Sequence, residues 1–141
     1  MPVVFQYAAK IVIGRSNGEV VAPGEYWTAV NVHNPYHYTW AMMRKRVVVA
    51  MPFEKPGPMT RTFFADLGPS EASEIDRQDI FRHLEESGIS MEFVKGFVVI
   101  ESPTDLNVVA VYTTMGREEI VQTFHTERVM PRTLEIVSWD E

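Results

Sequence analysis

The stretch that decides the fold runs from Phe97 to Tyr112 and reads FVVIESPTDLNVVAVY. Two apolar runs, FVVIE and LNVVAVY, flank the four residues Ser102–Asp105, SPTD. Ser, Pro and Asp are turn-forming residues, so this pattern predicts a β-hairpin. Because both arms are apolar almost throughout, we expect both strands to lie centrally in the fold, covered on both faces.

The rest of the chain repeats this alternation of short strands and turn residues. Runs rich in β-branched and aromatic residues are separated by clusters of Gly, Pro, Asn and Asp, which is typical of antiparallel strands. The sequence predicts an all-β fold: an Ig-like antiparallel β-sandwich of about seven to nine strands with one short helix, in a single domain spanning residues 1–141. The predicted strands are Val3–Ile13, Glu19–Val21, Tyr26–Asn34, Tyr38–Ala50, Thr60–Leu67, Phe93–Glu101, Leu106–Thr114, Ile120–Val129 and Thr133–Trp139.

Turn residues mark the boundaries between several of these strands. SNG at Ser16–Gly18 predicts a hairpin turn, because Asn and Gly accept positive φ, and APG at Ala22–Gly24 predicts a second turn. PFEKPGP at Pro52–Pro58 carries three prolines. Proline cannot donate to a ladder, so this segment is expected to be a surface loop rather than a central strand.

The single predicted helix spans about Arg77–Ser87, RQDIFRHLEES. Asp76 is placed to cap the backbone N–H of Asp79 at the helix start. Ile80, Phe81 and Leu84 fall on one side, and Gly88 follows the end, where a left-handed cap is easy for glycine. A single helix between strands of a sandwich is expected to cross one open end or to lie on its flank.

Composition excludes several functional classes. The 141 residues contain no cysteine, which rules out disulfides, thiolate zinc sites, iron–sulfur clusters and a cysteine nucleophile. The formal net charge of −6 disfavours a non-specific grip on nucleic acid or an anionic membrane. No apolar run approaches the length that spans a bilayer and no basic leader precedes the first strand, so a cytoplasmic location is expected, with leaderless export left open.

Five segments give the chain a resemblance to a family of small uncharacterised bacterial β-sandwich proteins. No activity is established for that family, so the resemblance implies a fold and no chemistry. The segments are PGEYWTAVNVHNP (Pro23–Pro35), LGPSEASEIDRQDI (Leu67–Ile80), FVKGFVVIES (Phe93–Ser102), LNVVAVYT (Leu106–Thr113) and FHTERVMPR (Phe124–Arg132).

A more distant similarity is to the sensory rhodopsin transducer family, small soluble oligomeric β-sandwiches. The shared order is a strand ending in an Asn-containing loop, a Leu-Gly-Pro turn leading to a polar strand, and then a central pair of apolar strands. The similarity implies an Ig-like sandwich that acts by binding and self-association. No partner-binding motif is matched residue by residue, so it implies no rhodopsin partner.

The segment NVHNPYHYTW, Asn31–Trp40, is dense in polar and aromatic residues and has the composition of a catalytic or metal site. On a strand, His33 and His37 would share a face about 13 Å apart, too far to hold one ion. Pro35 is expected to break the strand between them. We therefore expect the strand to end here and the aromatic residues to pack at a corner or form an interface, namely Tyr36, Tyr38 and Trp40.

A small-ligand or metal-binding sensor or transducer domain that uses His33, His125 and Glu127 is the alternative that the sequence leaves open. His125 and Glu127 alternate along a predicted strand and so share a face. His33 would join them only if its strand were a neighbour, and two His with one carboxylate suit a divalent metal. The other interpretation is an exposed or inter-subunit polar row, and no cofactor is predicted.

The run RKR, Arg44–Arg46, is the one basic cluster in the sequence. On a strand Arg44 and Arg46 share a face while Lys45 points the other way, so the run does not form one patch. Carboxylates in HLEESG (His83–Gly88) or REE (Arg117–Glu119) are the expected partners, within a subunit or between subunits.

No nucleophile elbow, phosphate loop, dinucleotide-binding glycine set or H-E-x-x-H motif is present. The sequence therefore predicts a non-enzymatic structural or binding module that self-associates into a homo-oligomer, and an enzyme would need a site assembled entirely by the fold. The terminal runs PVVF and LEIVSW either close the sandwich or pair with another subunit. The predicted interface residues are Tyr36, Tyr38, Trp40, Arg44, Arg46 and Trp139.

Overall fold

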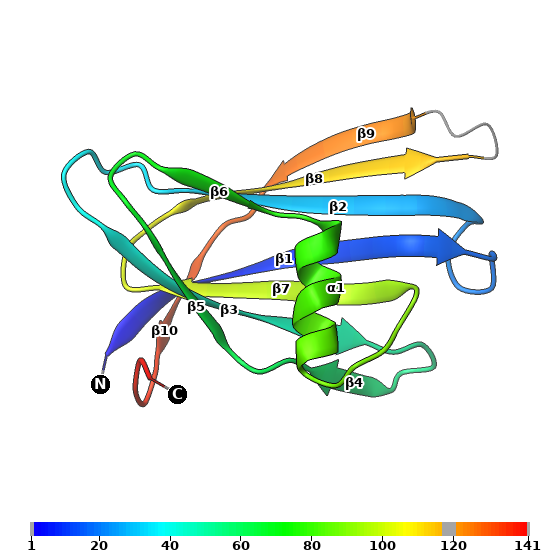
Figure 1. The fold of residues 1–141 in the computed structure, drawn as a ribbon, viewed down its shortest axis with the longest axis horizontal. Coiled ribbons are helices and arrows are strands. Elements are labelled where there is room, and N and C mark those ends of the chain that lie inside the picture. Colours follow the sequence, from blue (N-terminus) through cyan, green and yellow to red (C-terminus); the bar gives the residue numbers. More distant parts are fainter. Residues whose placement is uncertain (1, 117–120, 141) are drawn as a thin grey trace.

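The computed structural model describes residues 2–116 and 121–140 (Figure 1). Every strand pairing is antiparallel, and one helix accompanies the strands. The elements are β1 Val3–Ser16, β2 Gly24–His33, β3 Ala41–Ala50, β4 Pro56–Met59, β5 Phe63–Leu67, β6 Ala72–Ile75, α1 Arg77–Glu86, β7 Val94–Ser102, β8 Asn107–Met115, β9 Val121–Arg128 and β10 Arg132–Glu135.

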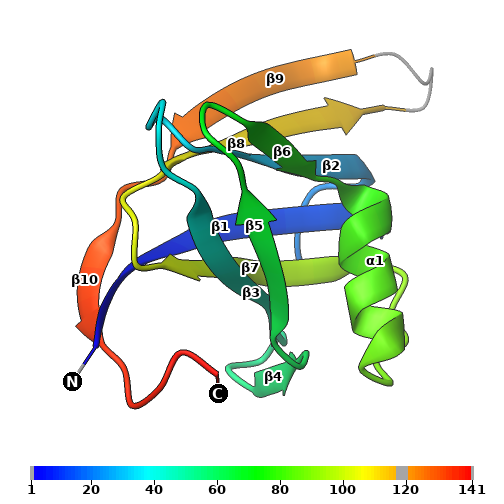
Figure 2. The same ribbon diagram turned by 60° about the vertical axis from the view of Figure 1, so that its left-hand side comes forward.

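The ten strands form one continuous sheet that folds into two layers (Figure 2). The strand order is β4-β3-β7-β1-β2-β8-β9, and β10, β5 and β6 pair with β1, β3 and β2 respectively. Strand β1 joins the layers: Phe5–Ile13 pair with β7, and Gly14–Ser16 pair with β2. The all-β, sandwich-like fold predicted from the sequence is confirmed, with ten strands instead of seven to nine.

The hairpin predicted across Ser102–Asp105 is wrong. Strand β7 pairs with β1 and β3 in one layer, and β8 pairs with β2 and β9 in the other, so the four residues cross between layers. The buried Tyr7 hydroxyl holds this crossing: it lies 2.8 Å from Asp105 Oδ1 and 2.7 Å from the backbone nitrogen of Leu106. Both arms are nevertheless central strands, because two apolar faces can be covered in separate layers as well as in one.

The helix follows its predicted start. Asp76 accepts a hydrogen bond from the backbone N–H of Asp79 at 3.0 Å, and the Asp79 side chain accepts from the Asp76 N–H at 3.0 Å, completing a capping box. Gly88 follows the end with φ of 77°, the left-handed conformation expected there. In Figure 2, α1 runs across the side of the sandwich from one layer to the other, with Ile80 and Leu84 buried against the core.

Several boundaries differ from the sequence predictions. The predicted strand Glu19–Val21 is a bend, and residues 17–23 form one loop between β1 and β2 in place of two separate turns. The segment Pro52–Pro58 includes part of β4, which pairs only with β3 and so is not a central strand. Strand β6 was not predicted, because its four residues are mostly polar or small. Ile120 lies outside the described residues, so the predicted start of β9 is untested there.

Both terminal segments pair within the chain. In β10, Arg132–Glu135 pair with the first residues of β1, and the backbone N–H of Ile136 donates to the Pro2 carbonyl at 2.9 Å. Of the two sequence alternatives, the structure has the terminal strands closing the sandwich. No helix within the described residues is long and apolar enough to cross a membrane.

Candidate binding surfaces

The loop between β2 and β3 is held in place by one buried amide. Asn34 is fully buried, and its side-chain nitrogen donates to the carbonyls of Thr39 at 2.8 Å and Gly68 at 3.0 Å. Its side-chain oxygen accepts from the Tyr36 N–H at 3.1 Å, which is the Asx-turn geometry expected for Asn-Pro. The strand therefore ends at His33, and the loop adopts a fixed shape, as the Asn34-Pro35 sequence predicts.

This loop presents its aromatic side chains to solvent. Tyr38 is 94% exposed and Trp40 is 67% exposed, while Tyr36 is 44% exposed. Large apolar side chains held outward by an ordered backbone are typical of a contact surface, because little conformational entropy is lost when a partner covers them. The structure thus places three predicted interface residues on one exposed, ordered loop.

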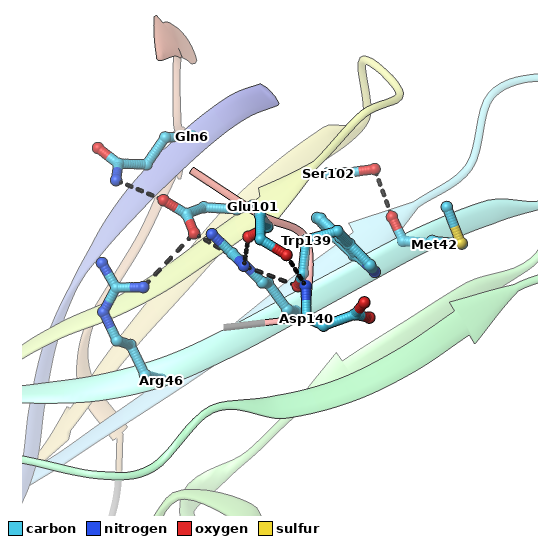
Figure 3. Close-up of polar contacts among 9 residues, drawn as sticks. Gln6, Met42, Arg46, Glu101, Ser102, Trp139 and Asp140 are labelled. Carbon is cyan, nitrogen blue, oxygen red and sulfur yellow. Dashed lines mark hydrogen bonds and ion pairs between the residues drawn. The ribbon is translucent and has the colours of Figure 1, made fainter. Parts of the chain in front are cut away.

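The basic run on β3 contacts a buried carboxylate that the sequence did not suggest as its partner (Figure 3). Arg44 Nε lies 2.9 Å and Arg46 Nη1 3.4 Å from Glu101 Oε1, and the Gln6 amide donates to Glu101 Oε2 at 2.8 Å. Burial alone would raise the pKa of Glu101, but the hydrogen bonds from Gln6 and Arg44 and the charge of Arg46 hold it below its ordinary value. Arg44 and Arg46 do share a face, as predicted.

The sequence predicted that carboxylates in HLEESG or REE would pair with the Arg44–Arg46 run. Within HLEESG, Glu86 pairs with Arg61 at 3.2 Å, not with the run. The REE segment lies outside the described residues. Lys45 points to the opposite face, where burial is the main cause that lowers its pKa.

Arg44 also fixes the C-terminal segment. Its Nη1 donates to the carbonyls of Ser138 at 3.1 Å and Trp139 at 2.8 Å, and its guanidinium carbon lies 5.1 Å from the Trp139 ring centroid. Phe64 meets the Trp139 ring edge to face, at 6.1 Å. Arg44 and Trp139 therefore contact each other inside the chain, and the exposed members of the predicted interface set lie on the β2–β3 loop.

The predicted metal ligands lie on two different faces and strands. His33 on β2 is opposite Asn107 of β8, with 3.4 Å between His33 Nδ1 and the Asn107 amide. His125 on β9 is opposite Tyr112, five residues further along β8, so β8 separates the two histidines. His125 Nε2 lies 3.8 Å from Glu127 Oε2, and both side chains are exposed. No group of three His, Asp or Glu residues suited to a metal occurs within residues 2–116 and 121–140.

His37 has its own partner and does not join His33. Its Nδ1 lies 2.9 Å from the Oγ of Ser70, a residue of the segment between β5 and β6. The prediction that Pro35 separates the two histidines is consistent with this geometry.

Strand β9 is an edge strand whose outer side meets no other described strand. It pairs with β8 over Val109–Met115, and the side chains from Thr123 to Arg128 are exposed on both faces. Phe124 is 67% exposed. In Figure 1, β9 forms the upper margin of the molecule, with one long side open.

The other described edges are short. Strands β4, β6 and β10 have four residues each and β5 has five, and β4 carries Pro56 and Pro58. Short edge strands and prolines are common protections against edge-to-edge pairing. The eight residues of β9 contain neither Pro nor Lys, and its charged residues are Glu127 and Arg128, so this edge is longer than the others and is not interrupted by proline. Sequence reasoning treated β9 as a possible metal strand and did not identify the edge, since pairing order is not encoded in local pattern.

A shallow cavity of about 300 Å³ lies between the outer face of β2 and β8 and the start of α1. Trp27, Val111 and Arg77 line it. The Arg77 guanidinium lies 4.5 Å from the Trp27 ring centroid and 3.4 Å from Glu25 Oε1, so its charge is already paired. The cavity therefore lies on the outer face of the second layer, which β2, β8 and β9 form. Arg77 does not offer it an unpaired charge.

No family model and no curated protein sequence matches the chain. Among solved structures, the chain is similar to the crystal structure of Thermotoga maritima 1070, with a TM-score of 0.53 and 13% sequence identity. The similarity covers 89% of this chain and 90% of that one. At this identity the likeness shows the fold alone, and the family resemblances noted in the sequence stay predictions.

Proposed function

We propose that the protein is a non-enzymatic structural or binding module that self-associates into a homo-oligomer. The observation that carries the proposal is the open edge of β9: eight residues without Pro or Lys, of which Thr123–Arg128 are exposed on both faces. A long edge without proline offers a row of backbone donors and acceptors to another strand. A cytoplasmic location is part of the same proposal.

The β2–β3 loop supports the proposal from a second surface. Tyr38 and Trp40 are exposed on a backbone fixed by Asn34. Aromatic residues are enriched at protein interfaces, where they bury a large area at a small entropic cost. A partner that is a second copy of the chain would suit both surfaces, and the net charge of −6 disfavours nucleic acid as the partner.

The metal-sensor alternative gains no support from the geometry. Strand β8 lies between the strands that carry His33 and His125, which leaves only His125 and Glu127 near each other. Two exposed side chains 3.8 Å apart do not define a metal site.

The proposal is tested by measuring the native mass of the full chain across a wide range of protein concentration. We expect species at multiples of the chain mass of 16.1 kDa, with the larger species favoured at higher concentration. A single species of 16.1 kDa at every concentration would overturn the proposal.

A further inference from the structure

We propose that two copies of the chain pair through β9, antiparallel across a twofold axis at Thr126, so that the second layers of both subunits form one continuous sheet. This inference rests on the proposed self-association and specifies its surface and register. Three observations carry it: the open edge of β9, the direction of its backbone groups, and the order of its side chains.

The direction of the backbone groups follows from one hydrogen bond. The Val129 N–H donates to the Val108 carbonyl at 2.9 Å. In an antiparallel ladder, alternate residues direct both backbone groups to the same neighbour. His125 and Glu127 therefore point their backbone groups towards β8, and Phe124, Thr126 and Arg128 point theirs away from it, to the open side.

This alternation limits the registers available to a second copy. A residue with outward backbone groups must face another such residue, so the axis passes through one residue and cannot fall between two. With the axis at Thr126, Thr126 faces its own copy, and Phe124 faces Arg128 of the other subunit. Each of these pairs can exchange two backbone hydrogen bonds.

The side chains distinguish this register from its neighbours. With the axis at Thr126, His125 faces Glu127 across a close, non-hydrogen-bonded pair, and the Arg128 guanidinium meets the exposed ring of Phe124. An axis at Glu127 would place two carboxylates opposite each other, and an axis at His125 would place two imidazole rings opposite each other. The register at Thr126 gives every charged side chain of Phe124–Arg128 a complementary neighbour.

The test uses the absence of cysteine from the chain. In Thr126→Cys, the new thiol meets its own copy at the axis, where the Cα atoms are about 5.5 Å apart, within the range for a disulfide. The matched control is Phe124→Cys, on the same strand and face, whose two copies lie about 13 Å apart along the paired strands. Both variants are oxidised mildly and separated under denaturing conditions without reductant.

We expect Thr126→Cys to shift mostly to a disulfide-linked species of twice 16.1 kDa, and Phe124→Cys to stay at the single-chain mass. Phe124→Cys mixed with Arg128→Cys should give a linked dimer of the two variants, which keeps the test valid if Thr126→Cys does not fold. Thermal melting of each variant checks folding.

The outcomes separate the two proposals. A wild-type chain that is monomeric throughout overturns both the self-association and the register. A wild-type oligomer in which neither Thr126→Cys nor the mixed variants cross-link overturns the β9 pairing alone. Equal cross-linking of Phe124→Cys and Thr126→Cys overturns the register.

Discussion

His83 is a buried histidine whose ring nitrogens have no hydrogen-bond partner within the described residues. The residue is 6% exposed and stacks on Phe63, with ring centroids 4.0 Å apart. Burial first, and then the charges of Lys45 and Arg82, lower its pKa from the ordinary 6.5 to about 4, while Asp79 and Glu86 act in the opposite direction. The ring is therefore neutral in the folded protein at neutral pH.

The expected pH dependence follows from this shift. Because the pKa is lower in the folded state, the unfolded chain binds more protons between about pH 6.5 and pH 4, so stability falls as pH falls through that window. A shift from 6.5 to about 4 corresponds to about 3 kcal/mol. Below the window both states are protonated and this contribution stops changing.

The variant His83→Phe removes the titrating group and keeps a ring against Phe63. It is expected to be more stable than wild type by about 1–3 kcal/mol at neutral pH, because two unsatisfied buried nitrogens are removed. That advantage should grow by about 3 kcal/mol by pH 4. Urea unfolding of both proteins at several pH values and one fixed protein concentration measures the difference. A difference that stays constant from pH 7.5 to pH 4 would refute the reasoning.

Two further predictions concern buried polar contacts. Arg44→Met removes the nearest charged partner of the buried Glu101 carboxylate and leaves it with Arg46 at 3.4 Å and the Gln6 amide at 2.8 Å, so we expect a loss of about 1.5–3 kcal/mol in the free energy of unfolding. Arg46→Met, at a more exposed site, is the matched control, and an equal loss from both would contradict the assignment. Asn34→Ala removes the hydrogen bonds that shape the β2–β3 loop. We expect a loss of about 1–3 kcal/mol in the free energy of unfolding and faster proteolysis within that loop. An unchanged rate of proteolysis would contradict the role given to Asn34.

The sequence predicts the parts of the fold that depend on local pattern. Alternation and β-branched composition identify most strands, and the capping residues Asp76 and Asp79 with Gly88 fix the helix within one residue of its end. The short strands β4 and β6 do not stand out, because four residues rich in Pro, Gly or polar side chains carry no clear period. The sequence-based error at Ser102–Asp105 has another cause: a four-residue link fits a hairpin and a crossing equally well. The pairing of each strand with distant partners separates them, and the Tyr7 hydroxyl bonds to the link.

In the candidate surfaces, too, the features that depend on local sequence could be predicted and those that depend on non-local pairing could not. The Asn34-Pro35 turn and the exposed aromatic residues after it follow from local sequence. The pairing of Arg44 with Glu101 joins residues 57 apart in the chain, and the open edge of β9 depends on the pairing order of every other strand. Non-local pairing of this kind is not visible in a single sequence.

The most direct test of self-association through β9 is the molar mass of wild type and Thr126→Pro by light scattering at the same high concentration. Proline at 126 removes an N–H that points away from β8, so the β8–β9 pairing is kept while pairing with a second copy loses its central bonds. We predict at least twice 16.1 kDa for wild type and a shift to 16.1 kDa for a folded Thr126→Pro. A wild-type mass of 16.1 kDa, or an oligomer unchanged by Thr126→Pro, would contradict the account.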